Sequence, residues 1–91
     1  MIKSFRSNAL RRFWLKGEIR RIDARHVDKV RRQLAVLDHA TKPEDMNLPG
    51  WRFHKLHGRR WAVWVDQNWR LTFAWGGEGP DAVDVDYEDY H

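Results

Sequence analysis

A chain of 91 residues without cysteine has room for one small core, which excludes a second domain, a disulfide framework and a thiolate metal site. We therefore expect a single domain that spans residues 1–91. The net charge is only +4, but residues 1–32 hold eleven Lys or Arg against three acids, whereas residues 76–91 hold six acids and neither Lys nor Arg. A basic half of this kind attracts polyanions, although a solvated helix surface or compensation by the acidic tail also explains it.

The chain shows no targeting or membrane segment. Its first residues, Met1 to Phe5, lack the apolar run of a signal peptide. No stretch approaches the ~20 apolar residues that a transmembrane helix needs. We expect a soluble, cytoplasmic protein with no membrane partner.

The N-terminal half begins with a predicted strand and a first helix. Residues 2–5 predict a short strand. Ser7 is suited to cap the helix that follows, and Gly17 is suited to end it. Three apolar residues at i, i+3 and i+4 share one face of this helix: Leu10, Phe13 and Trp14.

A second helix is predicted from Asp23, a favourable N-cap, to about His39. Spacings of three and four residues give it one apolar stripe: Val27, Val30, Leu34 and Leu37. Basic side chains occupy another face: Arg25, Lys29 and Arg32. We interpret both His26 and His39 as facing solvent.

From Trp51 the apolar period becomes two, which predicts strands over 51–56, 61–65 and 69–75, with turns at 66–68 and 76–80. In the third run Trp69, Leu71, Phe73 and Trp75 point one way and Arg70 points the other. On the last strand the face interpreted as core carries Val83, Val85 and Tyr87, opposite Asp84, Asp86 and Glu88. The order β-α-α-β-β-β-β predicts an α+β fold with two helices packed on one face of a mostly antiparallel sheet.

The polar face of such a sheet would gather His54, Arg70 and the terminal residues Asp89, Tyr90 and His91. Histidines beside an arginine suit acid–base cleavage of RNA. One group takes the proton of the 2′-hydroxyl, another protonates the 5′ leaving oxygen, and a cation stabilises the transition state. This chemistry needs no metal, no cofactor and no protein nucleophile.

Each of these residues also has a plainer explanation. His54 can be an ordinary surface histidine, Arg70 can pair with an acid of the tail, and His91 can be a frayed terminus. A metal site built from His54, Asp86, Asp89 and His91 lacks any compact ligand spacing.

Four segments together resemble the HigB group of the RelE superfamily, also called plasmid-maintenance killer proteins: residues 1–5, 49–58, 68–73 and 86–91. The likeness runs from end to end, and the ending Tyr-Glu-Asp-Tyr-His over 87–91 is its most specific part. The resemblance implies a RelE-like, microbial-RNase-like fold and a type II toxin that cleaves messenger RNA in the A site of the 70S ribosome. It also implies a cognate HigA-like antitoxin with a helix-turn-helix, through which the toxin would contact operator DNA only indirectly.

The resemblance also implies roles for individual residues. In that group the residues matching His54, Asp89, Tyr90 and His91 are linked to activity, and the arginine matching Arg70 is expected to bind phosphate. We expect the two histidines to be the acid and the base in either order, Asp89 to orient a histidine or an arginine, and Tyr90 to stack on a base or position the phosphate. RNA or ribosome contact is expected from the other basic residues: Arg6, Arg11, Arg12, Arg20, Arg21, Lys55, His57, Arg59 and Arg60.

One segment departs from the group, which often has His-Pro-Leu-Lys-Gly where this chain has His-Lys-Leu-His-Gly over 54–58. His57 replaces the expected lysine, and a histidine is only partly charged at neutral pH. We therefore expect the phosphate contact at this position to be weaker or more sensitive to pH. Lys55, Arg59 and Arg60 are expected to supply the missing positive charge.

Two alternative functions stay open: a ParE-like toxin that binds DNA gyrase, and a non-catalytic RelE-fold protein that represses its own operon with a partner. The paired acid–base groups favour the nuclease.

Overall fold

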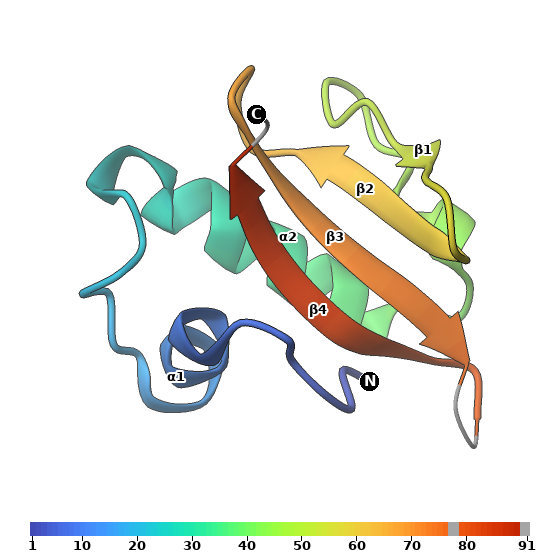
Figure 1. Ribbon diagram of the computed structural model, residues 1–91, viewed down its shortest axis with the longest axis horizontal. Helices are drawn as coiled ribbons and strands as arrows, with labels where there is room; N and C mark the ends of the chain where they lie inside the picture. The colour runs from blue at the N-terminus through green and yellow to red at the C-terminus, as the bar shows by residue number, and fades with distance from the viewer. Residues whose placement is uncertain (77–78, 90–91) are drawn as a thin grey trace.

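The computed structural model describes residues 1–76 and 79–89. Two α-helices come first, α1 (Asn8–Lys16) and α2 (Val27–His39), with 3₁₀ turns η1 (Ala24–His26) before α2 and η2 (Pro43–Met46) after it. One antiparallel sheet of order β1-β2-β3-β4 follows, made of β1 (His54–Lys55), β2 (Arg60–Trp64), β3 (Trp69–Gly76) and β4 (Asp81–Asp89) (Figure 1). In these residues no helix has the length and apolar character needed to cross a bilayer.

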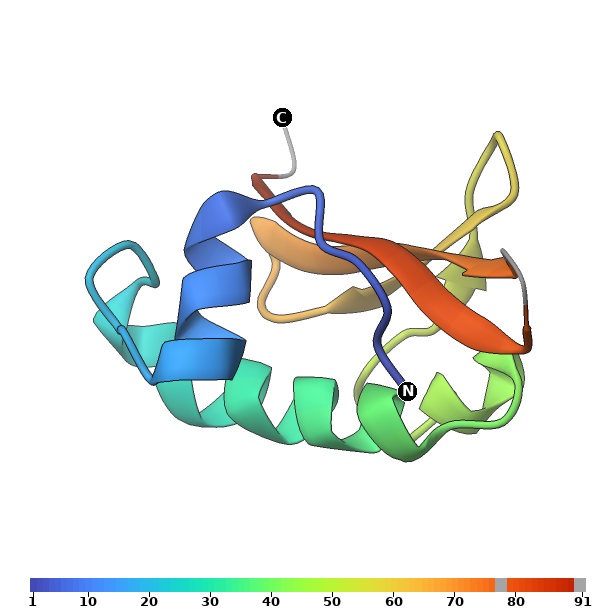
Figure 2. The ribbon, with the colours of Figure 1, turned by 90° about the horizontal axis from the view of Figure 1, so that it is seen from below.

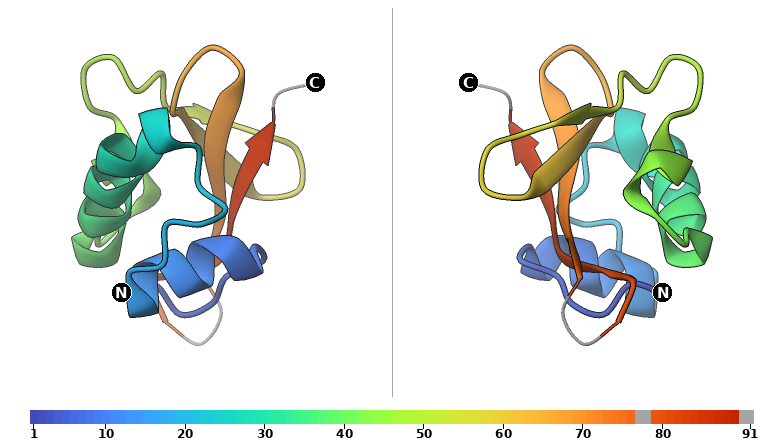
Figure 3. Two further views of the ribbon diagram at one scale, coloured as in Figure 1. Left: turned by 90° about the vertical axis from the view of Figure 1, so that its left-hand side faces the viewer. Right: turned by 90° about the vertical axis from the view of Figure 1, so that its right-hand side faces the viewer.

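Both α-helices lie on the same side of the sheet. Figure 2 shows α2 running below the strands and α1 standing between α2 and the level of the sheet. The two views of Figure 3 show that no helix of the described residues covers the other face of the sheet. This arrangement confirms the predicted α+β fold, in which the helices precede the strands and pack on one face.

The predicted helix caps are confirmed. The hydroxyl of Ser7 accepts a hydrogen bond from the first turn of α1 at 3.1 Å, and Gly17 ends that helix in the left-handed conformation with φ of 72°. Asp23 is also a cap, but it caps η1, so that α2 itself begins at Val27.

The hydrophobic core fills the space between the two helices and the sheet. Its fully buried members include Leu10, Val30, Leu34, Leu37, Met46, Val63, Leu71, Phe73, Ala82 and Val85. Phe73, at the centre of β3, is the largest of the fully buried side chains in the described part of the chain, and its ring stacks on Trp61 with centroids 6.2 Å apart. Since a small chain buries little surface in total, a large ring at this place carries a sizeable share of the apolar burial.

Phe73→Ala is expected to lower the free energy of unfolding by about 3–5 kcal/mol, because it removes a fully buried ring and leaves a cavity. Denaturant unfolding of the purified protein measures this change. Leu15→Ala, at a residue that is 63% exposed, is the control and should stay within about 0.5 kcal/mol of the wild type. Equal stability of the two variants would contradict the assignment of Phe73 to the core.

The N-terminal segment lies along β4 without forming a continuous strand (Figure 2). Ile2 and Phe5 make isolated parallel bridges with Ala82 and Val85. Between these bridges the hydroxyl of Ser4 accepts a hydrogen bond from the backbone of β4 at 2.9 Å, in place of a regular ladder bond. The strand predicted over residues 2–5 is therefore reduced to two bridges.

A bulge in β4 changes which side chains face the helices. The register of β3 with β4 shifts between Thr72 and Ala74, and Asp84 has a φ of 51°. The extra residue places Val83 opposite Ala74, on the face away from the helices, whereas Val85 is fully buried on the helix side. The prediction that Val83 and Val85 share one face is wrong for this reason.

Candidate active site

The face of the sheet turned away from the helices, here called the open face, carries polar side chains from all four strands. Cross-strand pairing forms one row from β1 to β4: His54, Ala62, Thr72 and Asp86. The next row, from β2 to β4, is Trp64, Arg70 and Glu88. Paired residues point to the same face of a sheet, so His54 and Arg70 share the open face.

His54 is oriented by the backbone just before β1. Its Nδ1 lies 2.8 Å from the carbonyl oxygen of Arg52, and Nδ1 must donate in this contact because a carbonyl oxygen only accepts. In the neutral ring Nε2 then keeps its lone pair and can take up a proton. Arg52 has a φ of 49°, a conformation outside the strand region, which limits the predicted strand over 51–56 to the two residues of β1. The Arg52 guanidinium also stacks over the ring of Trp64 at 4.2 Å, close to the row that contains Arg70.

A chain of hydrogen bonds crosses the centre of the open face. Arg60 Nη2 donates to the hydroxyl of Thr72 at 2.7 Å and to the carbonyl oxygen of Asp84 at 3.0 Å. The hydroxyl of Thr72 donates in turn to the carboxylate of Glu88. The pKa of Arg60 is lowered, first by burial and then by the charge of Arg6, although the acids of β4 oppose this shift. The sequence alone predicts no role for Thr72 or Glu88, and the signal that it does contain is their place on the polar side of the alternation.

The predicted catalytic residues near the end of β4 do not all lie on the open face. Asp89 pairs with Trp69, whereas Glu88 pairs with Arg70, so the carboxylate of Asp89 belongs to the helix side of the sheet. Tyr90 and His91 lie outside the described residues.

The predicted RNA-binding residues fall into two groups. One group lies on β1, the β1–β2 turn and the start of β2: Lys55, His57, Arg59 and Arg60, of which only Arg60 is half-buried and the others are exposed. The other group is N-terminal and exposed: Arg6, Arg11, Arg12, Arg20 and Arg21. In this second group Arg12, Arg20 and Arg21 line a cleft of about 180 Å³ between α1 and the segment that follows it.

Residues 1–76 and 79–89 contain no group of three or more His, Asp or Glu side chains arranged to hold a metal ion. Of the four residues in the metal alternative, His54 and Asp86 lie on the open face and Asp89 lies on the helix side. The fourth, His91, is outside the described residues.

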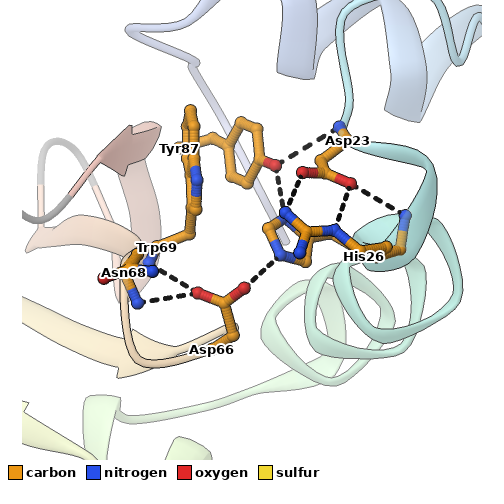
Figure 4. A network of polar contacts seen from close by, with 7 residues as sticks. Asp23, His26, Asp66, Asn68, Trp69 and Tyr87 are labelled. Carbon is orange, nitrogen blue, oxygen red and sulfur yellow. Dashed lines mark hydrogen bonds and ion pairs between the residues drawn. The ribbon is translucent and has the colours of Figure 1, made fainter.

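A second polar cluster, which the sequence did not predict, lies on the helix side of the sheet (Figure 4). His26 is only 3% exposed, so its interpretation as a solvent-facing residue is wrong, whereas His39 is exposed as expected. Nδ1 of His26 lies 2.6 Å from the hydroxyl oxygen of Tyr87, and Nε2 lies 2.6 Å from Oδ2 of Asp66. A signal for this burial was present, because His26 precedes Val30 by four residues and is in phase with the apolar stripe of α2.

Asp66 and Tyr87 each have further partners besides His26. Oδ1 of Asp66 accepts hydrogen bonds from the backbone N–H groups of Asn68 and Trp69 at 2.8 and 2.9 Å, and the hydroxyl of Tyr87 accepts one from Asp23 N at 3.4 Å. The ring of Tyr87 stacks on Trp69 with centroids 4.5 Å apart. Burial raises the pKa of Asp66, but the hydrogen bonds from His26 and the turn outweigh it and leave that pKa lowered. Burial is the main cause that raises the pKa of Tyr87 to about 12, so its hydroxyl keeps its proton at neutral pH.

Comparison with known proteins identifies the class to which this fold belongs. Residues 3–91 match the family described as the RelE-like toxin of the type II toxin–antitoxin system HigB. The chain therefore belongs to the HigB-like toxins, and the resemblance noted in its sequence is confirmed. One relative is the Endoribonuclease HigB of Proteus vulgaris, which is 36% identical over 94 residues, with the whole of both chains covered. Since a type II system pairs its toxin with an antitoxin, an antitoxin is a partner of this chain.

Proposed function

We propose that this toxin is a ribosome-dependent endoribonuclease that inhibits translation by cutting messenger RNA in the cytoplasm. The relative from Proteus vulgaris, which is named an endoribonuclease, supports this class of reaction. The observation that carries the proposal is the open face, which presents both a histidine with an available Nε2 and an arginine.

The proposed reaction is attack of the RNA's own 2′-hydroxyl on the adjacent phosphate. A base removes the 2′ proton, the bond from O2′ to phosphorus forms, the bond to O5′ breaks, and an acid protonates the departing oxygen. His54 and His91 are the two proton carriers in either order, and Arg70 stabilises the charge that builds on the phosphate. Strands β1 and β3 are two strand spacings apart, about 10 Å, which leaves room for a phosphodiester between His54 and Arg70. No metal or cofactor takes part in this scheme.

The remaining predicted residues bind and orient. Asp89 orients a histidine or an arginine, and Tyr90 stacks on a base or positions the phosphate. The basic group around the β1–β2 turn borders the open face and contacts the message, while the exposed N-terminal group contacts ribosomal RNA. The antitoxin partner is proposed to be a HigA-like helix-turn-helix protein, through which this toxin reaches operator DNA only indirectly.

Ribosome dependence is tested by comparing translated with naked RNA. Purified toxin is expected to cut a message in a translating extract and to leave the same RNA largely intact without ribosomes, because the acidic C-terminal segment lowers its affinity for free RNA. Mapping the 5′ ends of both RNA samples measures the difference. Rapid cleavage of naked RNA at physiological salt would contradict ribosome dependence, and growth arrest with intact messages would point instead to a gyrase-binding toxin.

A further inference from the structure

The cluster around His26 connects three segments that lie far apart in the sequence (Figure 4). His26 ends η1, Asp66 lies in the β2–β3 turn, and Tyr87 lies near the end of β4. The imidazole of His26 contacts the other two side chains at once, each at 2.6 Å. At 3% exposure and on the helix side of the sheet, this histidine is out of reach of an RNA bound on the open face. It therefore has no direct part in the proposed chemistry.

One arrangement of protons satisfies the whole cluster. Because Asp23 N–H donates to the oxygen of Tyr87, the hydroxyl proton of Tyr87 can be directed at Nδ1 of His26. The neutral imidazole then carries its own proton on Nε2 and donates it to Asp66. Short, directional hydrogen bonds of this kind, together with the stacked ring of Tyr87, hold the three segments at fixed positions relative to one another.

The cluster is linked through the backbone to Arg70 of the candidate site and to the end of β4. Oδ1 of Asp66 accepts a hydrogen bond from Trp69 N at 2.9 Å, and Trp69 directly precedes Arg70. Trp69 also pairs with Asp89, which follows Tyr87 by two residues. A movement of the cluster would therefore displace the start of β3 and the end of β4, and with the start of β3 it would displace Arg70.

We propose that His26, Asp66 and Tyr87 are positioning residues that fix the place of Arg70 on the open face for RNA cleavage. This role rests on the proposed function, since it requires that Arg70 acts on RNA. A displacement of about 1 Å in a reacting group can cost ~10²-fold in rate. Because Arg70 is proposed to act on charge that builds in the transition state, its displacement on loss of the cluster is expected to lower kcat and to leave KM unchanged.

Two conservative substitutions test the proposal. Tyr87→Phe keeps the ring that stacks on Trp69 and removes only the hydroxyl, and His26→Gln keeps a donor for Asp66 but removes the acceptor that faces Tyr87. Steady-state cleavage of ribosome-bound message is measured at a temperature below the melting point of every variant. Each substitution is expected to lower kcat by ~10-fold to 10²-fold at constant KM. The double variant should be no slower than the slower single variant, since both remove the same hydrogen bond.

His39→Gln, at an exposed histidine of the same helix, is the matched control and should cleave like the wild type. If Tyr87→Phe and His26→Gln lower the melting temperature but keep kcat within about twofold of the wild type, the cluster only stabilises the fold and the proposal is overturned. A higher KM at unchanged kcat also overturns it. Failure of the proposed function is distinct from both outcomes, because the wild type and His39→Gln would then leave every message intact.

Discussion

Arg70→Ala is expected to lower cleavage of ribosome-bound message by about 10²–10³-fold while the protein keeps its fold. Arg70 lies on the open face in the row between Trp64 and Glu88, so its guanidinium contributes charge to the proposed site and not to the core. Arg70→Lys should recover little of the lost rate, because one ammonium group cannot reproduce the planar fork with which a guanidinium holds a phosphate. Cleavage kinetics in a translating extract and thermal melts of the same samples measure the two effects separately.

Arg32→Ala is the control for Arg70→Ala, since Arg32 is an exposed arginine of α2, on the opposite side of the sheet. It should keep both full cleavage and a normal melting temperature. If Arg70→Ala unfolds as readily as Phe73→Ala, Arg70 is a structural residue and the site loses its cation. If the variant folds and still cleaves at the normal rate, the open face is not the active site.

His54→Ala should reduce cleavage by about 10²–10⁴-fold, the usual contribution of a general acid or base. The more selective variant is His54→Asn, whose amide nitrogen can still donate to the carbonyl oxygen of Arg52 but which has no counterpart of Nε2. We expect the two variants to lose the same factor in cleavage rate. The reaction needs the proton carried by Nε2 and does not depend on the hydrogen bond to Arg52. Single-turnover cleavage of a programmed ribosome measures the chemical step directly.

A rate for His54→Asn close to that of the wild type would show that Nε2 carries no proton in the reaction. The same result for both His54→Asn and His54→Ala would make His54 the ordinary surface histidine that its sequence position also allows. Normal melting temperatures are expected for both variants, since the imidazole is only half-buried.

The sequence was most informative where local chemistry determines local structure. Ser7 and Gly17 bound α1 because a side-chain cap and a left-handed glycine act within one turn of the chain. Alternation predicted the face of each side chain in β3, and the expectation that His54 and Arg70 share the polar face of the sheet is confirmed.

The errors arose where distant segments meet. The bulge at Asp84 accompanies contacts of β4 with Ser4 and Arg60, neither of which can be read from the alternation of β4 itself. His26 was assigned to solvent because histidine is polar, although its partners Asp66 and Tyr87 lie 40 and 61 residues away along the chain. Periodicity predicts which side chains point inward, but it does not identify the polar partners that make burial of a histidine favourable.

The protection of the two outer strands of the sheet affects how readily this protein aggregates. Strand edges with unpaired backbone groups can recruit strands from other molecules, and this is a common route to insoluble assemblies. Here β1 contributes only two residues to one edge, and the segment containing Ile2 and Phe5 runs along β4 at the other. Protection of both edges thus comes from within the toxin chain and does not require the antitoxin. Toxin made in excess of its partner should therefore stay dispersed, and so remain available to ribosomes, instead of joining edge to edge.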